Sequence, residues 1–171
     1  CLQHYNYLLT KQDQIQMQIL KSHTRQPITI LKDSETGQTV LNGYAVDIRY
    51  LHGSRNINWY GMFRLFDKDF RADLGFIPRV EYREYAAGTD YTFFSAKEGW
   101  WEKLKLGIDY SELKRSDGQL LNRLTAMKLT LFGTRQIHAY IKYENREEQY
   151  RNQSYKLQKL KLHHCMQPLD K

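Results

Sequence analysis

The stretch Gln14-Ile-Gln-Met-Gln-Ile19 decides the fold class, because apolar and amide side chains alternate in it without interruption. A period of two places Ile15, Met17 and Ile19 on one face of an extended strand and the three glutamines on the other. The same period recurs along the chain, so we predict an all-β fold in which each strand has one apolar face. The runs that share it are Tyr44–Tyr50, Ile57–Leu65, Leu104–Tyr110, Thr125–Leu131 and Ile137–Tyr143.

Residues 79–94 follow the pattern with one interruption. Val80 and Tyr82 are apolar at its start, and the apolar positions then continue from Tyr85 on the other parity. A β-bulge inserts one residue into a strand and would produce this change. We therefore predict a bulge near Glu84.

The two ends of the chain complete the set of strands. Tyr5 and Tyr7 predict a strand at the start, and the run from Tyr155 to Leu162 predicts one near the end, with its own change of parity. No segment shows a helical period. The chain thus reads as a single domain over residues 1–171, an antiparallel up-and-down meander of about nine strands of roughly 9–14 residues, lengths that suit a membrane β-barrel or a segment of one.

The connections between these strands vary in length in a regular order. Short connections are expected at 11–13, 52–55, 95–99 and 133–135, a moderate turn at 115–118, and longer loops at 22–42, 67–78 and 145–152. Outer-membrane barrels have short turns at one end and longer loops at the other. The order of loop lengths therefore favours such a barrel.

The chain is basic and rich in tyrosine, with a net charge of +7 and 13 tyrosines among 171 residues. Nucleic-acid binding, attraction to an anionic surface, and a barrel with a charged interior and aromatic girdles all have this composition. The basic residues are spread over all strands, which makes nucleic acid the second choice of partner. A soluble β-barrel that binds single-stranded nucleic acid or another anionic ligand remains the alternative.

Alternation alone does not decide between a soluble and a membrane barrel, because the two differ only in which face points inward. Aromatic residues end several apolar faces, as Tyr44, Tyr50, Tyr110 and Tyr143 do, and this suits girdles at a lipid interface. Together with the loop lengths and the charges within strands, this favours the bacterial outer membrane as the location and membrane lipid as a partner. A soluble all-β domain with solvated charged faces stays open.

In a membrane barrel the charged faces line the lumen. The predicted lumen-facing residues carry more positive than negative charge, which favours small anionic solutes. Cross-strand pairing that only holds a filled barrel together is the alternative role of these charges. The predicted residues are Arg49, Arg64, Arg79, Glu81, Arg83, Lys103, Lys105, Asp109, Lys128 and Lys142.

The segment Asp67–Arg83 is the least repetitive part of the chain. Pro78 fixes its own φ and favours an extended Ile77. Alternation after the proline predicts that Arg79, Glu81 and Arg83 share the lumen face.

Metal and catalytic sites are not predicted, and no cofactor is expected. The carboxylates of Asp67, Asp69 and Asp73 lack the full pattern of a calcium loop, so solvated carboxylates are the favoured interpretation. In His163-His164-Cys165, neighbouring side chains of a strand would point to opposite faces. No hydrolase or phosphate-loop signature is found, and an enzyme is the less favoured class.

Several segments, taken in order, resemble one kind of large bacterial outer-membrane protein, in which a carbohydrate-binding family 9-like domain precedes a C-terminal β-barrel whose function is not established. The resemblance runs from Asp13 to about Leu162 and is most specific in the second of the segments. They are Asn56-Ile-Asn-Trp-Tyr60, Asp69-Phe-Arg-Ala-Asp-Leu-Gly-Phe-Ile-Pro-Arg-Val-Glu-Tyr-Arg83, Trp100-Trp101, Leu106-Gly-Ile-Asp-Tyr110 and Asp117-Gly-Gln-Leu-Leu121.

This chain is several times shorter than proteins of that family and has no counterpart of the carbohydrate-binding domain, so it resembles an internal fragment of the barrel. The resemblance implies a pore or a membrane anchor linked to carbohydrate binding or uptake. It also implies carbohydrate and a larger outer-membrane complex as further partners. It brings no catalytic residues.

Overall fold

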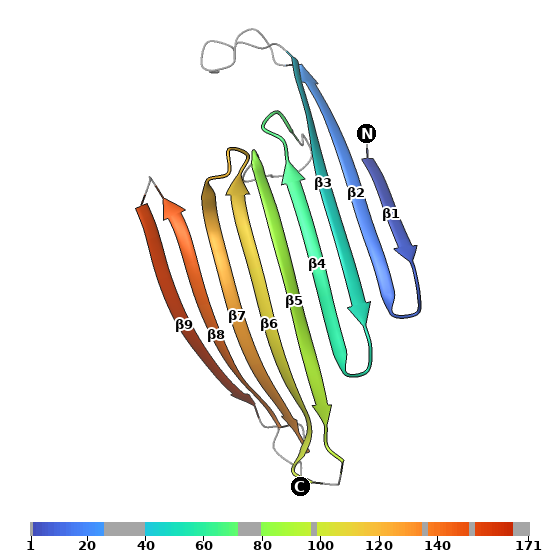
Figure 1. Cartoon of the computed structure of the whole chain (residues 1–171), viewed down its shortest axis with the longest axis vertical. Coiled ribbons are helices and arrows are strands. Elements are labelled where there is room, and N and C mark those ends of the chain that lie inside the picture. Colours follow the sequence, from blue (N-terminus) through green and yellow to red (C-terminus); the bar gives the residue numbers. More distant parts are fainter. Residues whose placement is uncertain are drawn as a thin grey trace.

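The computed structural model describes residues 2–25, 40–71, 80–96, 99–134, 137–150 and 153–165. Within these ranges the chain forms one antiparallel sheet whose strands follow each other in sequence order (Figure 1). This confirms the all-β up-and-down meander. The strands are β1 (Leu2–Leu8), β2 (Asp13–Arg25), β3 (Val40–Gly53), β4 (Ile57–Phe66), β5 (Tyr82–Phe94), β6 (Trp101–Arg115), β7 (Leu120–Gly133), β8 (His138–Tyr150) and β9 (Gln153–Cys165).

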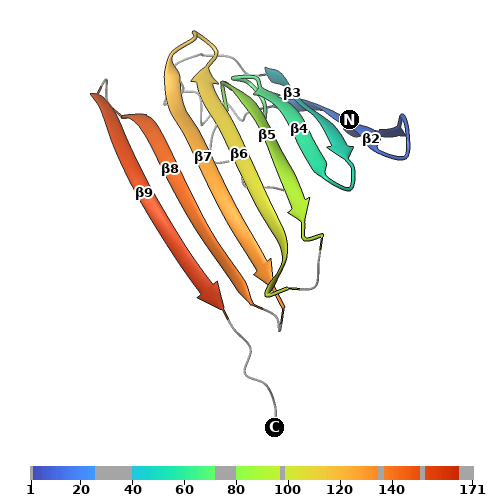
Figure 2. The same ribbon diagram turned by 60° about the horizontal axis from the view of Figure 1, so that its bottom comes forward.

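The sheet is curved and open. Figure 2 shows β1, β2 and β3 turned away from the plane in which β6 to β9 lie. β1 pairs only with β2, and β9 pairs only with β8, so the two stand at opposite edges. The arrangement corresponds to a barrel wall that is not closed within the described residues.

Short polar turns join the strands at one end of the sheet. The Oγ1 of Thr10 donates to Asp13 Oδ2 over 2.6 Å, and the Oγ of Ser54 donates to the carbonyl of Ile57 over 2.6 Å. Such local hydrogen bonds stabilise turns and compete with the continuation of a strand. They end β1 and β3 and let β2 and β4 begin.

The expected bulge near Glu84 is wrong. β4, β5 and β6 pair through this residue without a register shift, and the irregularities lie instead between Trp101 and Lys103 and between Leu113 and Lys114. The parity changes because Tyr82 points to the face opposite Tyr85. There its ring stacks on Phe66, with the ring centroids 5.0 Å apart.

The expected change of parity near the end of the chain has the same explanation. β9 pairs with β8 in one continuous register from Gln153 to Cys165. Leu157 therefore lies on the face opposite Leu160 and Leu162. At the start of β9, apolar side chains thus lie on the face that is otherwise polar, and the strand itself is not interrupted.

The order of loop lengths holds for only half of the chain. The connections 26–39 and 67–81 are long, but 116–119 and 151–152 are as short as the turns at the other end. The expected loop at 145–152 is wrong because β8 continues to Tyr150 and pairs with β9 throughout. Only two long connections therefore match the loop lengths expected of a membrane barrel.

The register divides the strand residues into two faces, which we name the apolar face and the polar face. The apolar face comprises Tyr5, Tyr7, Ile15, Met17, Ile19, Val46, Ile48, Tyr50, Trp59, Phe63, Leu65, Tyr85, Tyr91, Phe93, Leu104, Leu106, Ile108, Tyr110, Met127, Leu129, Leu131, Ile141, Tyr143, Leu160 and Leu162. The polar face comprises the intervening residues, with most of the charged side chains within strands.

The polar face is the more enclosed of the two. Ala45 and Ala126 lie on it and are only 1% and 2% exposed, because taller neighbours cover them. The large side chains of the apolar face are mostly exposed. The sheet therefore covers its polar side chains and leaves its apolar ones open, the reverse of a soluble barrel.

A short segment after β4 folds back over the polar face. Phe70 is 3% exposed and packs edge-on against Phe66, with ring centroids 5.6 Å apart. The backbone N–H of Asp67 donates to the carbonyl of Tyr44, and that of Arg71 donates to Ser22 Oγ. This segment and β2 to β4 hold most of the small buried core.

A helix long and apolar enough to cross a bilayer is absent from the described part of the chain.

Candidate functional site

The apolar face forms a continuous belt across the sheet. In β6 to β9, Leu106, Leu129, Ile141 and Leu162 lie directly opposite one another, and all four are exposed. Ile108, Met127, Tyr143 and Leu160 form the neighbouring row. Monomeric soluble proteins rarely expose apolar patches of this extent, and larger ones mark sites of interaction with a protein or a membrane.

An aromatic cluster ends the belt beside the turns that follow β1 and β3. The rings of Tyr50 and Trp59 stack with centroids 4.6 Å apart, and His52 stacks on Trp59 at 5.8 Å. The hydroxyl of Tyr50 donates to Asp13 Oδ1 over 2.6 Å. Aromatic rings with polar tips are typical of the level where lipid meets water.

Asp13 belongs to the turn at this end and lies beyond the belt. Hydrogen bonds from Thr10, Tyr50 and His52 lower the pKa of its carboxyl group to about 2. The carboxylate thus stays charged and fixes both the turn and the rings above it.

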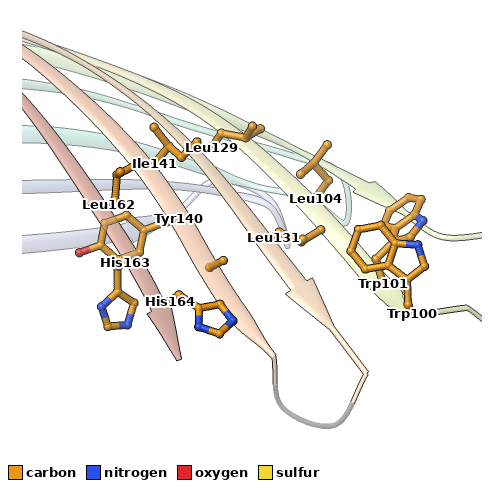
Figure 3. Close-up of a pocket in the computed structure, with 11 residues that line it drawn as sticks. Trp100, Trp101, Leu104, Leu129, Leu131, Tyr140, Ile141, Leu162, His163 and His164 are labelled. Atoms are coloured by element: carbon orange, nitrogen blue, oxygen red, sulfur yellow. The ribbon is translucent and has the colours of Figure 1, made fainter. Parts of the chain in front are cut away.

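A second aromatic pair ends the belt on β6. The bulge between Trp101 and Lys103 lets Trp101 share the apolar face with Leu104, although three positions separate them. Figure 3 shows the two indoles of Trp100 and Trp101 at one end of a groove and His163 and His164 at the other. The groove has a volume of about 700 Å³ and is lined mainly by Leu104, Leu129, Leu131, Ala139, Ile141 and Leu162.

A charged row ends the belt at its other edge. The guanidinium of Arg123 lies 3.6 Å from Glu112 and 3.6 Å from Glu147, its neighbours across β6 and β8. Lys156 follows opposite Glu147 on β9. On these strands the belt therefore lies between an aromatic end and a charged end.

The polar face carries a network of ion pairs over β3, β4 and β5. Arg64 donates from Nε to Asp47 over 3.0 Å and from Nη1 to Glu84 over 3.1 Å. Arg49 donates to the same Asp47 over 3.0 Å. Asp47, Arg64 and Glu84 are partly shielded from water and Arg49 is exposed, and each charge has an opposite partner.

Further along the polar face, side chains reach across a whole strand. The hydroxyl of Tyr60 on β4 donates to Asp109 on β6 over 3.0 Å, passing over Gly88 of β5. Beside it, Asp90 accepts a hydrogen bond from Asn58 and pairs with Lys105 over 3.0 Å. These residues line a groove of about 380 Å³ that extends to Lys128, Thr130, Phe132 and His138.

Cations gather on the polar face of β6 to β9. Lys142 and Lys161 both reach Glu144, at 2.8 Å and 3.2 Å. Lys128 lies over the ring of Tyr140 and Lys103 over that of Phe132, with the ammonium groups 4.5 Å and 4.3 Å from the ring centroids. This half of the face therefore has more positive than negative charge.

The structure places most of the predicted lumen residues on one face. Those on the polar face are Arg49, Arg64, Lys103, Lys105, Asp109, Lys128 and Lys142. Arg83 is a correction: it lies on the apolar face between Leu65 and Lys114, because Tyr82 occupies the polar face. Glu81 precedes β5 with a φ of 63°, and Arg79 lies outside the described residues.

Several members of the polar face are not among the residues predicted from the sequence. Lys161 stands between Leu160 and Leu162, so the alternation of this run would have placed it correctly. Glu84 was missed because the bulge was expected at this residue, and Asp90 was left out although its alternation with Tyr91 and Phe93 puts it on the polar face. Alternation in Ile57–Leu65 puts Tyr60 on the polar side, but nothing in the sequence pairs it with Asp109.

The residues considered for metal sites do not gather into one. His163 and His164 point to opposite faces, and Asp73 lies outside the described residues. Among the residues that the structure describes, no three His, Cys, Asp or Glu side chains gather closely enough to hold a metal ion.

Comparisons with known protein families, with curated proteins and with solved structures find no match to this chain.

Proposed function

We propose that this chain forms part of the wall of a bacterial outer-membrane β-barrel, with the apolar face toward lipid and the polar face toward the lumen. One observation carries the proposal: eight of the nine described strands expose large apolar side chains on one face, whereas the opposite face is more enclosed and carries most of the charged side chains within strands. Strands of outer-membrane barrels alternate in this way, and an outward apolar band between girdles is their common feature.

The wall acts as a membrane anchor or as part of a pore. Ion pairs fill the polar face around Arg64, which suits an anchor. The groove beside Tyr60 and the excess of cations on β6 to β9 suit passage or binding of small anionic solutes. A link to carbohydrate binding or uptake, and to a larger outer-membrane complex, follows from the resemblance of residues 69–83 to barrels that carry a carbohydrate-binding domain.

Two leucines of β9 provide a matched test. Leu160 on the apolar face and Leu157 on the polar face are 63% and 59% exposed, so an arginine at either position changes a similar amount of surface. A lipid-facing arginine costs up to about 2–4 kcal/mol at the centre of a bilayer, whereas one in the lumen costs little. Flotation with phosphatidylcholine vesicles and heat-modifiable mobility on gels would report insertion.

We expect the wild-type chain and Leu157→Arg to float with the vesicles and Leu160→Arg to stay largely in the aqueous fraction. A wild-type chain that is monomeric and fully soluble without detergent would contradict the proposal. Equal flotation of the two variants would also contradict it, because the apolar face would then have no special contact with lipid.

A further inference from the structure

Three lysines lie in a row on the polar face, and fewer carboxylates than lysines bind them. Lys128, Lys142 and Lys161 lie directly opposite one another on β7, β8 and β9. Residues in such positions have Cβ atoms about 4.5–5.5 Å apart, and like charges there destabilise the sheet. A sequence that places three ammonium groups side by side therefore needs a compensating anion.

The described residues supply only part of that compensation. Glu144 binds both Lys142 and Lys161, and it is 9% exposed. Lys128 has no carboxylate partner among the described residues and rests on the ring of Tyr140. Lys142 and Lys161 thus share one carboxylate, and Lys128 rests on a ring without one among the described residues.

Aromatic rings form a shelf beside this row, one position further along the strands. The rings of Tyr140 and His163 stack with centroids 5.0 Å apart, and His138 lies 5.8 Å from His163 and 5.0 Å from Phe132. Such rings offer a flat apolar surface that can receive the ring or apolar part of a ligand.

A groove leads to the same place. Its volume is about 380 Å³, and its lining includes Lys105, Lys128 and Thr130 as well as the carboxylates of Asp90 and Asp109, which Asn58 and Tyr60 bind. Lys105 adds a further cation, although Asp90 pairs with it at 3.0 Å. A small solute in this groove would meet Lys128 directly.

We propose that the row of Lys128, Lys142 and Lys161 binds the oxyanion of a small solute, a phosphate, sulfate or carboxylate group, while the ring shelf of Tyr140 and His163 receives the body of that solute. An oxyanion offers acceptors to several ammonium donors at once, and such charge-assisted hydrogen bonds are short and strong. The site depends only on the register of β7 to β9. It does not require the membrane location proposed above.

Thermal unfolding with inorganic phosphate tests the row. A ligand that binds only the folded state raises Tm, and the buffer is compared with sodium chloride at equal ionic strength to remove general screening. We expect phosphate to raise the Tm of the wild-type chain in detergent micelles above its value in chloride. Lys128→Gln should weaken phosphate binding about tenfold, the loss expected for a hydrogen bond to a charged group.

Lys161→Gln and Lys156→Gln form a matched pair, since both remove one positive charge from β9 but on opposite faces. The first should lose the phosphate effect and the second should keep it. Circular dichroism in chloride would show that each variant retains its sheet.

No rise in the wild-type Tm, or an equal rise in Lys161→Gln and Lys156→Gln, would overturn the proposal. Flotation of the same samples with vesicles reports the membrane proposal separately, so one of the two can fail without the other.

Discussion

The backbone of Phe70 occupies the space that a Cβ atom on Gly43 would need. This contact holds the start of the connection between β4 and β5 against the polar face of β3. Position 43 therefore requires glycine, because a side chain there would prevent the ring of Phe70 from reaching its buried position beside Phe66.

Gly43→Ala should displace the segment that holds Phe70. Overpacking in a filled site costs about 1–3 kcal/mol, and backbone cannot move aside as a flexible side chain can. Gly61→Ala is the control, because nothing lies within 4 Å of its Cβ position and alanine in a strand is favoured over glycine. Urea unfolding in micelles should show a loss for the first variant and none for the second, and equal midpoints would contradict the contact.

Gly88→Ala should break the hydrogen bond between Tyr60 and Asp109. A Cβ atom there would meet both side chains. Tyr60→Phe removes the same bond, whose contribution is about 0.5–1.5 kcal/mol. A double-mutant cycle should therefore show that the two losses do not add. Additive losses in urea would mean that Gly88 has no connection with this bond.

Arg64 should contribute more to stability than Arg49. Arg64 binds Asp47 and Glu84, and Arg64→Met leaves two carboxylates close together without their shared cation. Arg49 binds Asp47 only and is more exposed, so Arg49→Met should cost about 0–1 kcal/mol, as surface pairs do. The difference between the two free energies of unfolding, measured at pH 7, checks this order. A larger loss for Arg49→Met would contradict it.

Asp13 should give the fold an acid-sensitive contribution. Because its pKa is lowered from 3.8 to about 2, the carboxylate stabilises the folded state fully above pH 4, and this contribution disappears as the pH falls toward 2. Asp13→Asn should lower stability at pH 6 and should differ less from the wild type at pH 2. Urea midpoints across this range check the trend, and a constant difference would contradict it.

Alternation predicted the strands well because a sheet with one apolar face repeats its chemistry every two residues. Gln14–Ile19 and Leu104–Tyr110 lie in β2 and β6 with the expected faces. The same rule failed at Tyr82, where an aromatic residue packs on Phe66 and lies among the polar residues. The apolar character of a residue therefore does not by itself determine on which face of the sheet its side chain lies.

The polar network was harder to predict, because it depends on distances between strands far apart in the sequence. Tyr60 and Asp109 are 49 positions apart and meet only because β5 carries a glycine between them. The extent of β8 also escaped prediction. Residues 145–150 have the composition of a loop, but pairing of 145–148 with β7 and of all six residues with β9 makes them a strand.

The odd number of described strands limits how the sheet can be completed. Neighbours alternate in direction, so β1 and β9 run the same way along the wall. If these two edges met, they would form a parallel pair, the one exception in an otherwise antiparallel ring. Two copies inserted in the same orientation would likewise form a parallel pair where β9 of one adjoins β1 of the other. A further strand that pairs antiparallel with β1 or with β9 must run opposite to both of them. Strands added at the two edges of the sheet would therefore all begin with the same direction.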